Sequence, residues 1–479
     1  MAEIEPTPLP TPVPPLDEGW RGVVAEGRGP VLALVALGVW LNAADTLVTA
    51  TVMPSVSRDL GGYELFAWTV AGFLVGSILA GFTAGRLSER VGLRVATAVA
   101  GVVLAVGCAL SAWAPTIELF LAGRLVQGVG GGWVSGFAMV AVAVLFPARH
   151  LARVFALATT IWGVATVLGP LLGGLFAEAG LWRWAFWFFA AQAVVFAAAG
   201  PVLLRDSGRS ATGGRLPLPQ ILLLTAGLTA VACAGALTDG VAAVAAGLIG
   251  LGLLVAAVRL DHRAAVRLLP RGAGDVRTVA GAGYAAMFLL MGAGVGLTLY
   301  GPAVLQQLGG LSPLTAGYVV AIQALTWTCV ALAAAGAKPP DEGRWIRSGA
   351  VAVAAGTAAL AMVLPTANVL AVGVASAISG GGFGALSALT NRRVLGSLAV
   401  EDRAVGGSAV NAVRQTGSAV GAALAGVAAN AVGFGDGLSD SSARSAAFWV
   451  FVAATPLAIG GVVAAWRLTA QPAAAAEPV

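Results

Sequence analysis

One acidic residue lies in the middle of an apolar stretch. Asp45 is part of LNAADTLVTATVMP, residues 41–54, and Asn42 and Thr49 share its face at helical spacing. A lone carboxylate in hydrocarbon would be protonated and neutral, whereas one that faces a wet cavity near an arginine can gain and lose a proton. Such switching is the property that a proton-coupled carrier requires. The structural alternative is an aspartate whose hydrogen bonds only hold helices together.

A second segment, AGRLVQGVGGGWVSG, repeats polar and small residues on one helical face. These residues are Arg124, Gln127, Gly128, Gly131 and Ser135. An arginine inside a membrane helix costs about 2.5–3.5 kcal/mol or more unless it is paired or faces water. Arg124 is therefore expected to turn toward a polar interior. The alternative is that its side chain reaches back to the membrane boundary.

The composition indicates that membrane helices position these residues. Of 479 residues, 58% are hydrophobic and 10% are charged, and the mean hydropathy is +0.89. A soluble chain has about 45–50% apolar and about 25% charged residues, so no soluble fold could bury this much apolar surface. This excludes a soluble enzyme and a nucleic-acid-binding protein. The sequence also has no GxxxxGK loop and no metal-ligand cluster, so it supports neither ATP-driven transport nor a cofactor.

A helix needs about 20 mainly apolar residues to cross the hydrocarbon core of a membrane. Reading the chain at that window predicts fourteen spans. They are residues 30–53, 64–85, 94–113, 117–146, 151–176, 183–204, 217–237, 241–258, 277–303, 313–336, 346–364, 367–390, 404–432 and 444–467.

The cationic residues alternate between the connections of these spans. One side carries 22 arginine and lysine residues and the other carries three. By the positive-inside rule the richer side is cytoplasmic, which places both termini there. Residues 1–29, which are rich in proline, and residues 469–479 are predicted to be cytoplasmic tails, the first of them disordered. The chain is expected to be a multi-pass protein of the cell membrane.

The connection between the second and third spans, GRLSERVGLR, closely resembles the loop motif of the major facilitator superfamily, Gly-x-Leu-x-Asp-Arg-x-Gly-Arg-Lys. The matching residues are Gly85, Glu89, Arg90, Gly92 and Arg94, with glutamate in the aspartate place. In that family the acidic residue meets a helix N-terminus of the opposite half and latches the cytoplasmic side shut. A carboxylate is favoured at the positive end of a helix dipole. The partner helix here would begin near Ala404.

Two further motifs strengthen the resemblance. Arg124, Gln127 and Gly128 match the superfamily's arginine and Gln-Gly motif of the fourth helix. GVATVLGPLLGGLF, residues 163–176, resembles the antiporter motif Gly-x-x-x-Gly-Pro-x-x-Gly-Gly, with Ala165 in place of the first glycine. Its matching residues are Gly169, Pro170, Gly173 and Gly174. The resemblance implies that this segment permits tight helix packing that limits proton leak.

The second half of the chain carries one clear match. NAVRQTGSAVG, residues 411–421, resembles helix thirteen of the fourteen-helix drug:proton antiporters, and it contains a second intramembrane arginine, Arg414. The resemblance implies an all-α polytopic membrane protein with the major facilitator fold. Its six-helix bundles would be residues 30–204 and 276–468, and a linker, residues 205–275, would carry two inserted helices. Substrate and coupling ion would bind between the halves, which rock to alternate access.

The leading hypothesis is a proton-driven antiporter that exports lipophilic small molecules. Asp45 would alternate between protonated and ionised states, and Arg124 would favour the ionised one. The expected substrate cavity contains Asn42, Trp68, Phe73, Gln127, Trp133, Trp162, Gln323, Trp327, Asn411, Arg414 and Gln415. The proton is the only expected coupling ion, the other partners are the substrate and membrane lipids, and a monomer suffices.

Two alternatives stay open at this point. One is a dedicated exporter of a lipid or endogenous metabolite on the same scaffold, because the same motifs serve there. The other is a non-transporting membrane sensor or scaffold, in which the intramembrane charges would be costly without a use. The charge of the substrate is not decided by the sequence.

Overall fold

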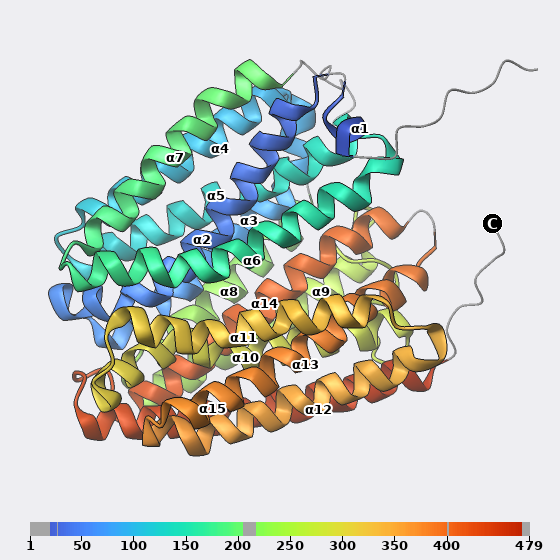
Figure 1. Cartoon of the computed structure of the whole chain (residues 1–479). Helices are drawn as coiled ribbons and strands as arrows, with labels where there is room; N and C mark the ends of the chain where they lie inside the picture. The colour runs from blue at the N-terminus through green and yellow to red at the C-terminus, as the bar shows by residue number, and fades with distance from the viewer. Residues whose placement is uncertain (1–19, 26, 205–216, 400–401, 472–479) are drawn as a thin grey trace, which may run out of the picture.

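The computed structural model describes residues 20–25, 27–204, 217–399 and 402–471. Within these residues the chain is helical and has no strand (Figure 1). The helices are α1 (Trp20–Val24), α2 (Gly29–Leu60), α3 (Trp68–Val91), α4 (Leu93–Trp113), α5 (Ile117–Leu145), α6 (Ala148–Glu178), α7 (Trp182–Leu203), α8 (Leu218–Ala234), α9 (Gly240–Arg263), α10 (Val279–Gly309), α11 (Pro313–Ala335), α12 (Pro339–Val363), α13 (Val369–Gly396), α14 (Arg403–Asn430) and α15 (Asp440–Ala470). Short 3₁₀ helices, η1 (Tyr63–Leu65) and η2 (Leu364–Thr366), precede α3 and follow α12.

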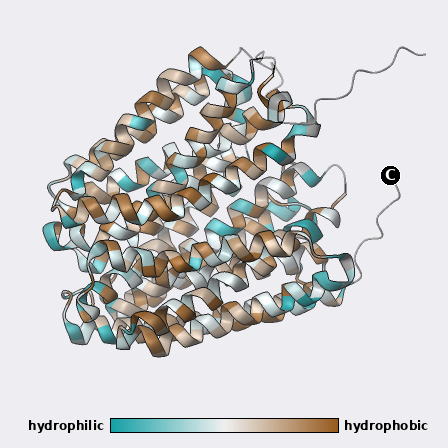
Figure 2. Cartoon of the chain, viewed as in Figure 1, coloured by the Kyte–Doolittle hydropathy of each residue, from teal (hydrophilic) through white to brown (hydrophobic). Residues whose placement is uncertain are grey.

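Twelve helices of the described residues are long and apolar enough to cross a membrane, which confirms the polytopic all-α class. The two other long helices are α8, which has 17 residues, and α14, which is more polar. Hydrophobic residues predominate along the helices in Figure 2. The predicted count of fourteen spans and the cytoplasmic termini stay predictions. Most of both predicted tails, and residues 205–216 of the predicted linker, lie outside the described residues.

The helices pack as two groups with a helix pair beside them. In the first group α5 packs against α3 and α4, α7 packs against α4, and α6 lies along α2. In the second group α11 packs on α13, α10 on α14 and α15, and α12 on α13 and α15. The pair α8 and α9 lies where the two groups meet, because α8 contacts both α3 of the first group and α14 of the second. Figure 1 shows the groups close together at one end and diverging toward the other.

The groups are joined by aromatic and hydrogen-bonded contacts at one end, which we call the closed end. Three aromatic rings meet there with their centroids 5.1–5.6 Å apart, and we call them the ring cluster: Phe66, Tyr300 and Phe434. The Asn430 amide donates to the carbonyl oxygens of Glu64 at 2.9 Å and Gly235 at 3.1 Å. Asn430 therefore ties α14 to η1, which precedes α3, and to the end of α8.

Glycines bring α5 close enough to its neighbours to orient its polar face. A Cβ atom on Gly128 would lie 2.1 Å from the Phe73 carbonyl oxygen of α3, and one on Gly130 would lie 2.3 Å from the Leu104 nitrogen of α4. Backbone contact of this kind is typical of small residues at membrane helix interfaces. It fixes the rotation of α5 and turns Gln127 toward α2.

Candidate functional site

The predicted acid and arginine form a buried ion pair between α2 and α5. The Arg124 Nη1 lies 3.1 Å from Asp45 Oδ2 and 3.4 Å from Oδ1, and both side chains are 3% exposed. The Gln127 amide nitrogen donates to Asp45 Oδ1 at 2.5 Å, and its oxygen accepts from Arg124 Nη1 at 2.8 Å. The three side chains form a closed triangle of hydrogen bonds. A buried charge is tolerated when it is paired and bonded in this way.

Helix α3 supplies the remaining contacts of Arg124. The guanidinium Nε donates to the Thr69 carbonyl oxygen at 3.2 Å, and the Phe73 ring centroid lies 4.7 Å from Cζ. A cation over an aromatic face gains electrostatic attraction when it is shielded from water. Arg124 is therefore held by α2, α3 and α5 together. Sequence reasoning did not identify the Thr69 carbonyl, because any helix backbone offers such an acceptor and no residue type signals it.

This geometry lets a proton change the contacts between helices. An ionised Asp45 accepts all three side-chain bonds, whereas protonation would remove its charge and leave the Arg124 charge unpaired. Because the two residues lie on different helices, the change would alter how α2 is held against α5. Within the described residues no group of three or more His, Cys, Asp or Glu side chains could hold a metal ion.

The other predicted cavity residues lie in several places. Gln323 lines a small cavity of about 40 Å³ between the two groups, together with Thr51 and Pro170, and donates to Ser379 Oγ at 3.1 Å. Asn42 is partly buried beside the ion pair on α2, one turn before Thr46, whose hydroxyl donates to its carbonyl.

The predicted aromatic residues are not gathered into one site. The Trp133 Nε1 donates to Thr83 Oγ1 at 2.9 Å and so serves the contact of α5 with α3. Trp162 is 43% exposed on α6, and Trp68 is partly buried at the start of α3. On α14, Asn411 is exposed and Gln415 is partly buried. The ion pair is the most strongly organised part of the candidate site.

The antiporter-like segment of α6 lies against both groups. Cβ atoms on Gly169 and Gly173 would lie 2.6 Å from Leu47 and 2.9 Å from Thr51, both of α2. One on Gly174 would lie 2.6 Å from the Leu314 Cα of α11. The glycines thus allow α6 to approach α2 in its own group and α11 in the other. The proposed effect on proton leak stays a prediction.

The predicted latch loop, Gly85–Arg94, connects α3 to α4. Gly92 turns the chain at φ +82° between α3 and α4, a backbone conformation that glycine adopts without strain. Glu89 and Arg90 are exposed, and within the described residues Glu89 makes no hydrogen bond or ion pair. The loop lies away from the closed end, so contact with α14 would require the diverging end to close.

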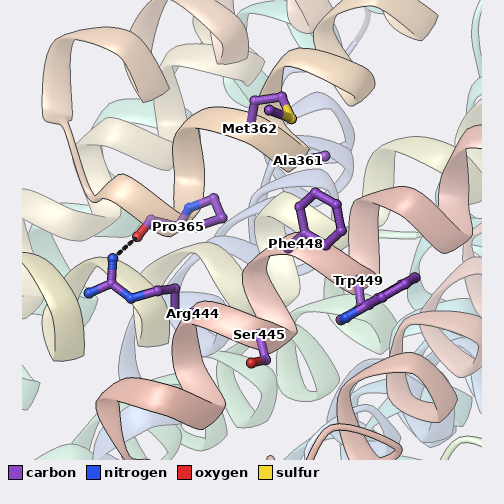
Figure 3. A pocket seen from close by; sticks show the side chains of 7 residues that line it. All are labelled: Ala361, Met362, Pro365, Arg444, Ser445, Phe448 and Trp449. Atoms are coloured by element: carbon purple, nitrogen blue, oxygen red, sulfur yellow. Dashed lines mark hydrogen bonds between the residues drawn. The ribbon is translucent and has the colours of Figure 1, made fainter.

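A surface groove of about 340 Å³ lies outside this site, between the end of α12 and the start of α15. Met362, Phe448 and Trp449 line it, and Arg444 Nη1 donates to the Pro365 carbonyl oxygen at 3.1 Å (Figure 3). None of the predicted site residues lines this groove.

Comparison with known proteins identifies the family. The family model of the Major Facilitator Superfamily matches residues 35–422. A Mycobacterium tuberculosis protein named "Probable multidrug-efflux transporter" is 31% identical over 467 residues, which are 94% of this chain and 96% of the relative. Multidrug resistance protein 3 of Bacillus subtilis is 30% identical over 158 residues, 33% of this chain and 30% of its own length.

Solved structures support the same fold. A peptide transporter in complex with sulfate has a TM-score of 0.67 at 15% identity, covering 94% of this chain and 96% of its own. The E. coli xylose transporter, in a partially occluded inward open conformation, has a TM-score of 0.59 at 18% identity, covering 91% and 97%. At these identities the likeness concerns the fold. The chain is therefore a non-enzymatic, multi-pass membrane transporter of small molecules that belongs to the Major Facilitator Superfamily.

Proposed function

We propose that this chain is a proton-coupled antiporter that exports lipophilic small molecules by alternating access. The observation that carries the proposal is the buried triangle of Asp45, Arg124 and Gln127. Charged side chains within a membrane are costly and are usually retained for a function, and here Asp45 of α2 is bonded to two side chains of α5. Proton exchange at Asp45 is the use that its chemistry offers, and the full-length relatives named as multidrug-efflux transporters favour export.

The closed end favours alternating access. The ring cluster and the Asn430 bonds hold the two groups together at one end. At the other end, Glu89 of the loop Gly85–Arg94 is exposed and bonds to none of the described residues. A rocking motion that separates the ring cluster would bring that loop toward α14. The carrier would then present its interior to the opposite side of the membrane.

The test uses proteoliposomes that contain a pH-sensitive dye and an imposed proton gradient. A panel of lipophilic dyes and drugs is added to wild type and to Asp45→Asn. We expect substrate-evoked proton movement in wild type and its loss in the variant. Asp59→Asn is the matched control, because Asp59 lies on the same helix but is exposed and paired with Arg183.

Two results would contradict the proposal. Uphill export by Asp45→Asn at the wild-type rate would show that coupling does not use this residue. A wild-type protein that folds but moves no compound of the panel would favour a dedicated carrier of a lipid or endogenous metabolite. The monomer is proposed as the working unit, since the ion pair and the closed end are complete within one chain.

A further inference from the structure

A second arginine lies deep in the helix bundle without an acidic partner. Arg414 is eleven residues from the start of α14, a distance of about 16 Å along the helix axis. It is partly exposed, and within the described residues its guanidinium takes part in no hydrogen bond or ion pair. If its unbonded nitrogen atoms were fully buried, they would count among the buried polar atoms without a partner, and they do not. The guanidinium nitrogens are therefore exposed. The guanidinium is thus open to an acceptor from outside the chain.

An aromatic pair fixes the place of this guanidinium. The Arg414 Cζ lies 5.4 Å from the ring centroid of Trp327, which belongs to α11. The Trp327 ring in turn stacks on Phe383 of α13, with centroids 5.0 Å apart and planes inclined by 19°. The side chain therefore reaches from α14 across to α11. Stacking on an indole holds an arginine in position while its edge stays free to donate hydrogen bonds.

The charge of Arg414 is not balanced by the ion pair described above. Among the described acidic residues, Asp45 alone lies far from the ends of its helix, and its charge is matched by Arg124. Among the described arginines without an acidic partner, Arg414 lies deepest in its helix, eleven residues from the start of α14. An unpaired arginine at this depth is costly unless water or a ligand satisfies it.

We infer that Arg414, held on Trp327, binds an acidic group of the transported molecule, so that the substrates are lipophilic monoanions with an aromatic body. A carboxylate suits the planar donor edge of a guanidinium, with two parallel hydrogen bonds. An aromatic body suits the indole beside it. The inference rests on the proposed transport function and adds the charge of its substrate. Binding and proton exchange would then use different helices, α11 and α14 for the substrate and α2 and α5 for the proton.

The test compares pyrene probes of negative, zero and positive charge. Pyrenebutyric acid, its methyl ester and pyrenemethylamine are titrated at neutral pH against the purified full chain in lipid nanodiscs, with empty discs subtracted. We expect the acid to bind wild type about tenfold more tightly than the ester. Arg414→Gln should remove this difference without weakening the ester, and Arg414→Lys should keep part of it, because the charge stays but the planar donor edge is lost.

Arg347→Gln is the matched control. The Arg347 Cζ lies 5.6 Å from the Trp466 ring centroid, so this variant removes an arginine–tryptophan stack of similar geometry elsewhere in the second group. It should leave the preference for the acid unchanged. Elution volume and melting temperature verify that each variant is folded, and the charge-preserving Arg414→Lys keeps the test valid if Arg414→Gln unfolds.

The inference is overturned if the acid shows no saturable binding, if the ester or amine binds wild type as tightly as the acid, or if Arg414→Gln keeps the preference. Equilibrium binding needs no proton gradient, so its result is independent of coupling. Wild type that prefers the acid but exchanges no protons would contradict the proposed antiport and leave the substrate class standing. Proton exchange evoked only by the amine would support the proposed antiport and contradict the anionic substrate class.

Discussion

The ion pair between α2 and α5 allows a quantitative prediction. Its nitrogen and oxygen atoms are 3.1 Å apart. At an effective dielectric constant of about 20, two unit charges at this distance attract by about 5 kcal/mol. Removing one partner of a buried pair typically costs about 3–5 kcal/mol, because the other charge is left uncompensated. We therefore expect Asp45→Asn to lower the free energy of unfolding by about 3–5 kcal/mol.

The assay is a double-mutant cycle. Wild type, Asp45→Asn, Arg124→Gln and the double variant are unfolded in mixed micelles with increasing dodecyl sulfate, and unfolding is followed by tryptophan fluorescence. The double variant should lose less free energy of unfolding than the two single variants lose together, because it removes both charges and leaves neither unpaired. The exposed pair Asp59–Arg183 is the control, and removing it should cost under about 1 kcal/mol.

One result would refute the reasoning. If Asp45→Asn costs less than about 1 kcal/mol and the two single effects add, the carboxylate is already neutral in this conformation. Asparagine then resembles the protonated acid, and the geometry seen between Asp45 and Arg124 is not an ion pair. The proton-loaded state would in that case be the one closed at the ring cluster.

Three further predictions follow from the packing. Gly128→Ala places a Cβ 2.1 Å from the Phe73 carbonyl oxygen and should abolish the monodisperse peak in size-exclusion chromatography, whereas Gly81→Ala, with nothing within 4 Å, should not. Phe66→Ala removes a ring from the ring cluster and should widen the distance between spin labels at Leu181 and Val369. This distance is measured by electron paramagnetic resonance in a background without the three native cysteines. An unchanged distance would contradict the role of Phe66 at the closed end. Glu89→Gln weakens the expected latch and should leave this conformation's stability within about 0.5 kcal/mol of wild type, because the side chain is exposed here; a larger loss would mean that Glu89 already has a partner.

The sequence was sufficient to predict the pairing of Asp45 with Arg124. Asp45 lies in the middle of α2 and Arg124 lies seven residues from the start of α5, both in apolar segments. Two opposite charges in a low-dielectric interior lower their cost by meeting. The same reasoning placed Gln127 with them, since it shares a helical face with Arg124 one turn away. The Thr69 carbonyl and the ring cluster could not be predicted, because a carbonyl has no residue signature and an aromatic residue near a helix end is equally typical of a membrane boundary.

Helix ends were predicted less well than helix cores. The first predicted span ends at residue 53, but α2 continues through Pro54 to Leu60, and α10 likewise continues through Pro302 to Gly309. A hydropathy window detects the part of a helix that lies in hydrocarbon, and helices extend beyond it. Proline inside a membrane helix is tolerated when neighbouring groups satisfy the freed backbone. The span at residues 404–432 was predicted with the same window, although α14 is not among the twelve described helices that are apolar enough to cross a membrane.

The position of α2 explains how protonation could influence the closed end. Asp45 lies on the same helix as Thr51, which borders Gly173 of α6 and Gly317 of α11. A Cβ on Gly317 would lie 3.0 Å from Thr51 Oγ1, so α2 and α11 are in close contact across the two groups. Release of the bond between Asp45 and α5 would loosen α2 where it also meets α11. A change of charge in one group is thus expected to act on the contact between the groups through one rigid helix, without a separate relay of side chains.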